Sequence, residues 1–242
     1  MKLSFINLKK TTLHFTIVFL AAATSHALAW KGIFIAGDDS IENFDNGRED
    51  VTTQFAKMGQ LQSVQLSSSD KFISEQKHVF PATSQYVLAA FDQMSKKAGD
   101  ACLIHMTSHG THGQGIYLSK AGILPPKTFE QLLTKACGNL PTVVLISACY
   151  SGQFITESIK GPNRIILTAA RADRPSFGCS ADTRYTYWDE CLLEELPVSK
   201  KWTDLYQNVS KCISKKETAL GAKPSEPQAF FGANTKNWEI LK

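Results

Sequence analysis

Short apolar runs alternate with amphipathic stretches along most of the chain. Continuous apolar or β-branched runs predict strands, and apolar residues repeated every three or four positions predict helices. The predicted strands cover residues 32–36, 61–66, 101–106, 143–146, 164–168 and 228–231, and the predicted helices cover residues 49–58, 84–97, 126–136 and 201–215. Strands that alternate with helices are typical of a mostly parallel sheet covered on both faces, so the predicted fold class is α/β in a single domain.

The longest segment without a regular pattern is 171–191, which is polar and aromatic. A loop of this length inside a compact domain is usually functional. Its charged residues are either ordinary surface charges or contacts to a substrate, and they include Arg171, Asp173, Asp189 and Glu190. Their place beyond a strand end favours substrate contact.

The N-terminus has the parts of a secretory signal peptide. Three lysines precede the apolar stretch 13–24, and Ala27-Leu28-Ala29 offers a cleavage point. A membrane-spanning helix needs about 20 apolar residues, and this stretch is about half that length. We therefore expect a signal peptide over residues 1–29, a mature domain over residues 30–242 with no membrane span, and export to the periplasm or the medium.

The net charge of the chain is +4 at neutral pH, and the predicted leader holds three lysines and no acid. The mature chain therefore carries +1. Nucleic-acid binding normally needs a strongly basic surface, so no DNA or RNA partner is expected.

All six cysteines follow the predicted leader, in a compartment where disulfides can form. If Cys149 is a working thiol, five cysteines remain and at most two bridges are possible. Cys102 lies inside an apolar strand-like run, so we expect it to be a buried free thiol. The other four cysteines allow three pairings, among which the sequence does not choose.

Two of the strongest predicted strands end in reactive residues. One is followed by His109-Gly110 and the other by Ala148-Cys149. Sites form at the carboxyl ends of parallel strands, so this histidine and this cysteine are expected to face one crevice. A thiolate with a nearby imidazole is the minimum apparatus for cleaving an amide. Gly110 permits close approach of a substrate, and amide groups near Gly110 and Cys149 could bind an oxyanion.

Each of these residues also has a simpler interpretation. A cysteine at a strand end is often a buried structural thiol, but the turn sequence Tyr150-Ser151-Gly152 indicates that Cys149 leaves the core. His105 is expected in the core and His112 in a loop. A zinc site built from these histidines and His109 is disfavoured, because residues 105 and 109 of an extended strand lie about 13 Å apart.

The two strand endings, 40 residues apart and in this order, resemble those of the peptidase clan that includes caspases, gingipains and legumains. Segments 147–152, 169–174, 177–180 and 227–228 resemble bacterial members of the legumain-like C13 family. The resemblance implies a caspase-like three-layer sandwich with a six-stranded, mostly parallel sheet. It also implies hydrolysis through a thioester on Cys149 with His109 as acid/base, with no cofactor and no metal.

The resemblance also implies a binding pocket for the residue before the cleaved bond, the P1 residue. Legumains use a serine and an acid to recognise P1 asparagine, and the matching candidates are Ser176 and Glu190, with Asp189 as the alternative acid. Ser147 stands where legumains carry a glutamate, and the auxiliary asparagine matches Asn43 or Asn46. Asparagine at P1 is expected, with lysine or arginine as the runner-up.

Two further functions use the same residues. A transpeptidase or ligase would form the same acyl-enzyme and pass it to an amine instead of water. A non-catalytic peptide-binding relative would not need both His109 and Cys149, and the chain has both. The expected partner is a peptide or protein substrate, and the oligomeric state stays open.

Overall fold

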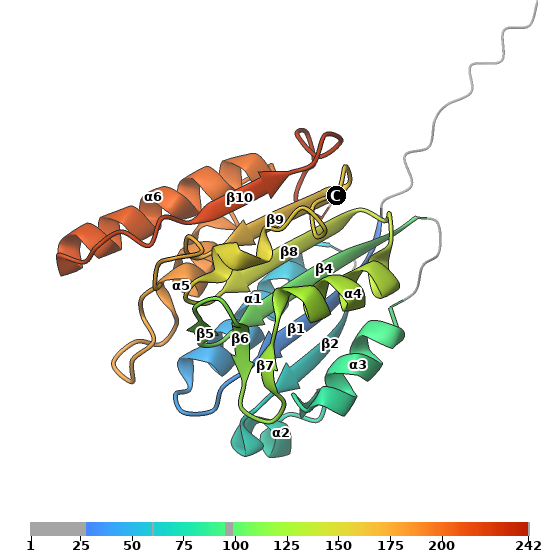
Figure 1. The fold of residues 1–242 in the computed structure, drawn as a ribbon, viewed down its shortest axis with the longest axis horizontal. Coiled ribbons are helices and arrows are strands. Elements are labelled where there is room, and N and C mark those ends of the chain that lie inside the picture. Colours follow the sequence, from blue (N-terminus) through green and yellow to red (C-terminus); the bar gives the residue numbers. More distant parts are fainter. Residues whose placement is uncertain (1–27, 60, 95–98, 242) are drawn as a thin grey trace, which may run out of the picture.

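The computed structural model describes residues 28–59, 61–94 and 99–241. A seven-stranded sheet lies between two layers of helices (Figure 1). Its strand order is β10-β9-β8-β4-β1-β2-β3, and all neighbouring strands are parallel except β9 and β10. The strands are β1 (Ala29–Ala36), β2 (Leu61–Ser67), β3 (Val79–Pro81), β4 (Asp100–Thr107), β8 (Thr142–Ser147), β9 (Arg164–Thr168) and β10 (Gln228–Phe231).

Alternate side chains of each strand enter two separate cores, as the two-residue period of a strand requires. On β4, Leu103 packs with helices α1 (Asn43–Met58), α5 (Tyr187–Glu195) and α6 (Trp202–Leu220). Ile104 packs on the opposite face with α3 (Ser84–Asp92) and α4 (Pro126–Cys137). The second face also carries the small antiparallel sheet of β5 (Gly110–Thr111), β6 (Gly115–Leu118) and β7 (Gly122–Leu124). The predicted α/β sandwich is thus confirmed.

Several elements differ from the sequence-based expectation. The sheet has seven strands instead of six, because the three-residue edge strand β3 is too short to leave a pattern. Helix α1 begins at Asn43 instead of residue 49. Its first turns bury polar side chains, so they lack the apolar pattern that predicts a helix. Helix α3 ends at Asp92, and the irregular segment ends where Thr186 caps α5. Short α2 (Asp70–Glu75) and η1 (Ser151–Phe154) were not predicted.

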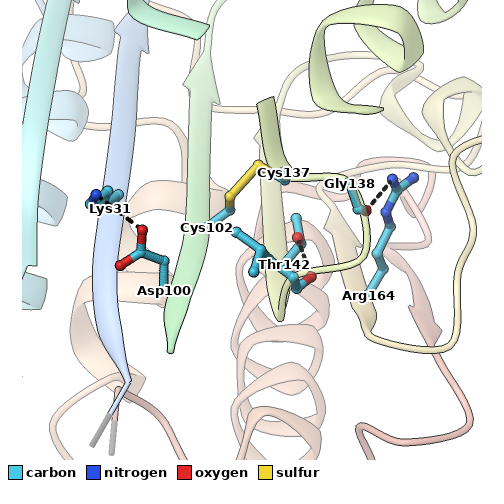
Figure 2. Close-up of a disulfide and its surroundings, with 8 residues drawn as sticks. Lys31, Asp100, Cys102, Cys137, Gly138, Thr142 and Arg164 are labelled. Carbon is cyan, nitrogen blue, oxygen red and sulfur yellow. Dashed lines mark hydrogen bonds and ion pairs between the residues drawn. A yellow bond between two sulfur atoms is a disulfide. The ribbon is translucent and has the colours of Figure 1, made fainter. Parts of the chain in front are cut away.

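The disulfides correct the expectation for Cys102. Cys102 pairs with Cys137 (Cα–Cα 6.2 Å) and Cys191 pairs with Cys212 (5.8 Å). The side chain of Cys102 shares the α4 face of the sheet with Ile104, which brings it to the last residue of α4. Figure 2 shows this bridge at the amino end of β4, near the Lys31–Asp100 ion pair. The free cysteines are Cys149 and Cys179.

The predicted signal peptide lies almost wholly outside the described residues. Ala29, the last residue of that prediction, is already the first residue of β1, and its N–H donates to the carbonyl of Gly99 (2.9 Å). Within the described ranges, no helix combines the length and apolarity needed to cross a bilayer.

Candidate active site

The two predicted dyad residues follow strands that are neighbours in the sheet. Thr107 ends β4 and Ser147 ends β8, and these two residues are partners in the parallel register. His109 and Cys149 each come two residues later. The loops then touch through their main chains: a β-carbon built on Gly110 would lie 1.8 Å from the carbonyl oxygen of Cys149. The histidine loop is therefore packed directly on the cysteine turn.

The Cys149 thiol faces the loop that follows β9. The Ser176 N–H donates to Sγ of Cys149 (3.2 Å), and the Ser176 hydroxyl oxygen lies 3.6 Å from the same sulfur. The sulfur therefore lies within reach of two hydrogen-bond donors of Ser176. The turn itself is fixed to the loop, because Tyr150, in the left-handed region (φ 57°), donates its N–H to the carbonyl of Arg174 (2.8 Å).

The imidazole of His109 is half-exposed and lies beside a buried carboxylate. Its Nε2 is 3.9 Å from Oδ1 of Asp38, and the Phe44 ring packs against the imidazole in a T-shaped arrangement with 5.0 Å between ring centroids. Asp38 follows β1 and accepts a hydrogen bond from the N–H of Ser40 (2.8 Å). Asp38 was not predicted, although its position directly after the first strand is a recognisable signal.

Two amide groups near the thiol are available to a ligand. Tyr117 N–H donates to the carbonyl of His109 (2.8 Å), and Gly110 opposes Ile116 in the β5–β6 ladder. Gly110 and Ile116 are therefore a non-hydrogen-bonded pair, and Gly110 N–H points away from β6. The N–H of Cys149 also makes no hydrogen bond within the described part of the chain. Together these donors can stabilise a negatively charged oxygen.

The model of the "Peptidase C13 family" matches residues 33–232. The chain belongs to the peptidase C13 family. The structural search adds the crystal structure of caspase-1 from Spodoptera frugiperda, with a TM-score of 0.62 and 15% sequence identity over 85% of this chain and 87% of that one. That likeness concerns the fold, and it confirms the caspase-like architecture. No curated protein sequence matches.

Family membership makes this chain a cysteine peptidase. Asn43 and Asn46 of this C13 peptidase lie at the start of α1 and hold the loop after β9. Asn43 donates to the carbonyl of Gly178 (2.6 Å), and Asn46 donates to that of Arg184 (3.1 Å). Both line a depression of about 550 Å³ between residues 40–46 and 180–184. The buried Oδ1 of Asn43 has no hydrogen-bond partner among the described residues.

Two residues expected to contact substrate are buried in this C13 peptidase. Asp189 is fully buried, and its carboxylate is bonded to His105, Thr107 and Thr186. Ser147 is also buried, and its hydroxyl lies 2.8 Å from that of Thr186. The expectation that these two side chains bind substrate therefore does not fit the structure. No pattern in the sequence indicates that both side chains are buried with Thr186 as their shared hydrogen-bond partner.

The other candidates lie at the surface. Glu190 forms an ion pair with Lys216 of α6 (2.9 Å) and lines a depression between α1 and α5, where it contacts neither Ser176 nor Cys149 among the described residues. Arg171 pairs with Asp173 and with Glu226, so it joins the loop to the segment before β10. The ring of His112 packs against that of Tyr150.

Proposed function

We propose that this C13 peptidase is an endopeptidase in which Cys149 is the nucleophile and His109 is the acid/base. The observation that carries the proposal is the contact between Gly110 and Cys149, which brings the histidine loop onto the cysteine turn. The Cys149 thiolate attacks the scissile carbonyl, and the oxyanion is held by the N–H groups of Gly110 and Cys149. His109 protonates the departing amine, and water, deprotonated by His109, then releases the acid from the thioester.

Two alanine variants test these roles on a fluorogenic peptide. Cys149→Ala removes the nucleophile and is expected to abolish turnover, and His109→Ala is expected to lower it by a factor on the order of 10³ or more, because the two groups act as a unit. Cys179→Ala is the matched control, since Cys179 is the other free cysteine. Wild-type turnover by a folded Cys149→Ala protein would refute the assignment.

The preferred P1 residue is proposed to be asparagine. Support comes from the legumain-like family and from the position of Ser176 beside the thiol. Because Glu190 pairs with Lys216 of α6 and Asp189 is buried, the proposal assigns neither of them as the acid of that pocket. Peptides that differ only in P1 asparagine, aspartate, lysine or arginine, assayed with wild type and Ser176→Ala, decide the preference. Best cleavage after lysine or arginine would favour the carboxylates of Glu42 and Asp182, which line the nearby depression.

A transpeptidase or ligase remains the second candidate function, because the same thioester serves both reactions. Mass analysis of products formed with and without an added peptide amine separates them. A joined peptide would indicate transfer, and free acid alone would indicate hydrolysis. Failure of a substrate-sized thiol reagent to label Cys149 would favour the non-catalytic binding relative.

We also propose that the chain is exported after removal of residues 1–29. The two disulfides support this, because such bridges persist in oxidising compartments. Intact-mass measurement of the native protein tests it, with Trp30 as the expected first residue. Finding the soluble cytoplasmic protein with its leader attached would contradict export.

A further inference from the structure

We propose that Asp189 is a positioning residue that holds the carboxyl ends of β4 and β8 in a fixed arrangement, and with them His109 and Cys149. The inference rests on the proposed function and extends it to a buried residue that does not face the substrate. It concerns a carboxylate that touches neither dyad residue and acts through the strands that carry them.

The Asp189 carboxylate joins the two strand ends by short hydrogen bonds. On β4, Thr107 donates its hydroxyl to Oδ2 of Asp189 (2.6 Å). On β8, Ser147 reaches the same carboxylate through one intermediary, because its hydroxyl lies 2.8 Å from that of Thr186, which donates to Oδ2 (3.0 Å). Thr107 and Ser147 are register partners, and each precedes its dyad residue by two positions.

The same carboxylate also fixes a third strand residue and two helices. Nε2 of His105 lies 2.9 Å from Oδ1 of Asp189, and both side chains are fully buried. Thr186 caps α5, because its Oγ1 accepts a hydrogen bond from the Asp189 N–H (3.0 Å). On α1, the main chain at Gly47 presses against the carboxylate, since a β-carbon there would lie 2.6 Å from Oδ2.

A charge with no exposure to water is costly unless every acceptor site is satisfied. Here the two oxygens receive hydrogen bonds from His105, Thr107 and Thr186, so the network is stable only when the donors converge on it. Polar networks of this kind favour one arrangement of the core over nearby alternatives. Removing one hydroxyl is therefore expected to loosen the spacing of the strand ends without exposing the core.

Thr107 offers the sharpest test, because two small substitutions distinguish the effect of its hydroxyl group from the effect of its side-chain volume. Thr107→Val keeps the volume and removes the donor, whereas Thr107→Ser keeps the donor. Thr142→Val is the matched control: Thr142 is a buried threonine at the opposite end of β8, and its hydroxyl donates to the carbonyl of Leu140 (2.8 Å). Asp189→Asn tests the carboxylate itself.

Peptide hydrolysis, melting temperature and the rate of Cys149 alkylation by iodoacetamide are measured for each variant. Misplacement of a reacting group by about 1 Å costs up to about 100-fold in rate, so Thr107→Val and Asp189→Asn are expected to lower kcat by at least about tenfold, with KM within about twofold. Alkylation of Cys149 is expected to slow in parallel. Thr107→Ser is expected to restore kcat, and Thr142→Val to leave it unchanged.

The proposal is overturned if Thr107→Val keeps the wild-type kcat and alkylation rate, or if Thr142→Val lowers kcat equally at equal loss of melting temperature. If Asp189→Asn does not fold, the three threonine variants carry the test. If the wild type cleaves no peptide, the proposed function fails, and the alkylation rates still decide whether Asp189 positions the thiol.

Discussion

The main chain of Gly110 lies against the carbonyl group of Cys149 so closely that no side chain fits at residue 110. A β-carbon there would be 1.8 Å from the carbonyl oxygen, 2.8 Å from its carbon and 3.2 Å from the Cys149 nitrogen. All three contacts are with backbone, which cannot move aside as a flexible side chain can. Glycine is therefore required here by contact with the backbone of Cys149, the proposed nucleophile, and not by an unusual φ angle.

Gly110→Ala is expected to separate the histidine loop from the cysteine turn. The shift needed to relieve the contact exceeds 1 Å, so kcat/KM is expected to fall by about 100-fold. Gly161→Ala is the control, because the atoms nearest to a β-carbon there belong to the flexible side chain of Arg164, the first at 3.3 Å. A folded Gly110→Ala protein with wild-type kinetics would contradict the packing of the two loops.

The two free thiols are expected to differ in reactivity. Burial, reinforced by the neighbouring Cys149, Asp189 and Asp38, raises the pKa of Cys179 to about 12. A raised thiol pKa means that almost no thiolate is present at pH 8, and the thiolate is the reactive form. Iodoacetamide at pH 8 is therefore expected to modify Cys149 in the native protein and Cys179 only after denaturation. Peptide mapping by mass spectrometry locates the modified residue, and equal labelling of both in the native state would refute this.

Acid is expected to release the loop that carries Ser176. The hydrogen bond from Arg171 lowers the pKa of Asp173 from its usual 3.8 to about 2. A carboxyl group whose pKa is lowered by folding stabilises the folded loop above about pH 4. This stabilisation is lost as the pH falls through about 2. Limited proteolysis of wild type and Asp173→Asn at matched pH values measures this. At pH 5 the loop of the wild type is expected to be cut more slowly than the loop of Asp173→Asn, and near pH 2 the two proteins are expected to be cut at the same rate. Equal cutting rates of the two proteins at both pH values would contradict the role of the Arg171–Asp173 ion pair.

The Cys102–Cys137 bridge is expected to stabilise the fold without contributing to the reaction. It closes a segment of 35 residues, and a loop of that length corresponds to about 4 kcal/mol of unfolding free energy. About 17 Å of strand separates Cys102 from Thr107 at the other end of β4. Replacing both cysteines by alanine is expected to lower the denaturation midpoint in urea and leave kcat unchanged. A large loss of kcat in the folded variant would show that the two ends of the strand are coupled.

Sequence patterns were sufficient for the parts of the molecule in which polarity and burial agree. The apolar strands that precede His109 and Cys149 predict both the sheet and the edge at which the two residues meet. They fail where polar groups are buried together. Asp189 looks like a loop acid in the sequence, and only the fold brings it to His105, 84 residues away. Thr186 followed by Asp189 is a helix start signal that would have located α5.

The cysteine assignment failed for a related reason. An apolar strand context describes the surroundings of Cys102 and does not identify a partner for it. The partner, Cys137, is set by the fold, in which α4 packs on the face of the sheet to which Cys102 points. The position of Glu190 was equally out of reach, since only the fold brings this side chain of α5 to Lys216 of α6.

The order of the cysteines along the chain has a consequence for how the protein matures. The bridges join the first cysteine to the second and the fifth to the sixth, so neither encloses the other and neither spans Cys149. If the chain is exported as proposed, it emerges from a membrane pore amino end first and presents Cys102 and Cys137 before Cys149 has appeared. The first bridge can then close while Cys149, the proposed nucleophile, is still inside the pore. The order of the cysteines along the chain would thus keep Cys149 out of that pairing step.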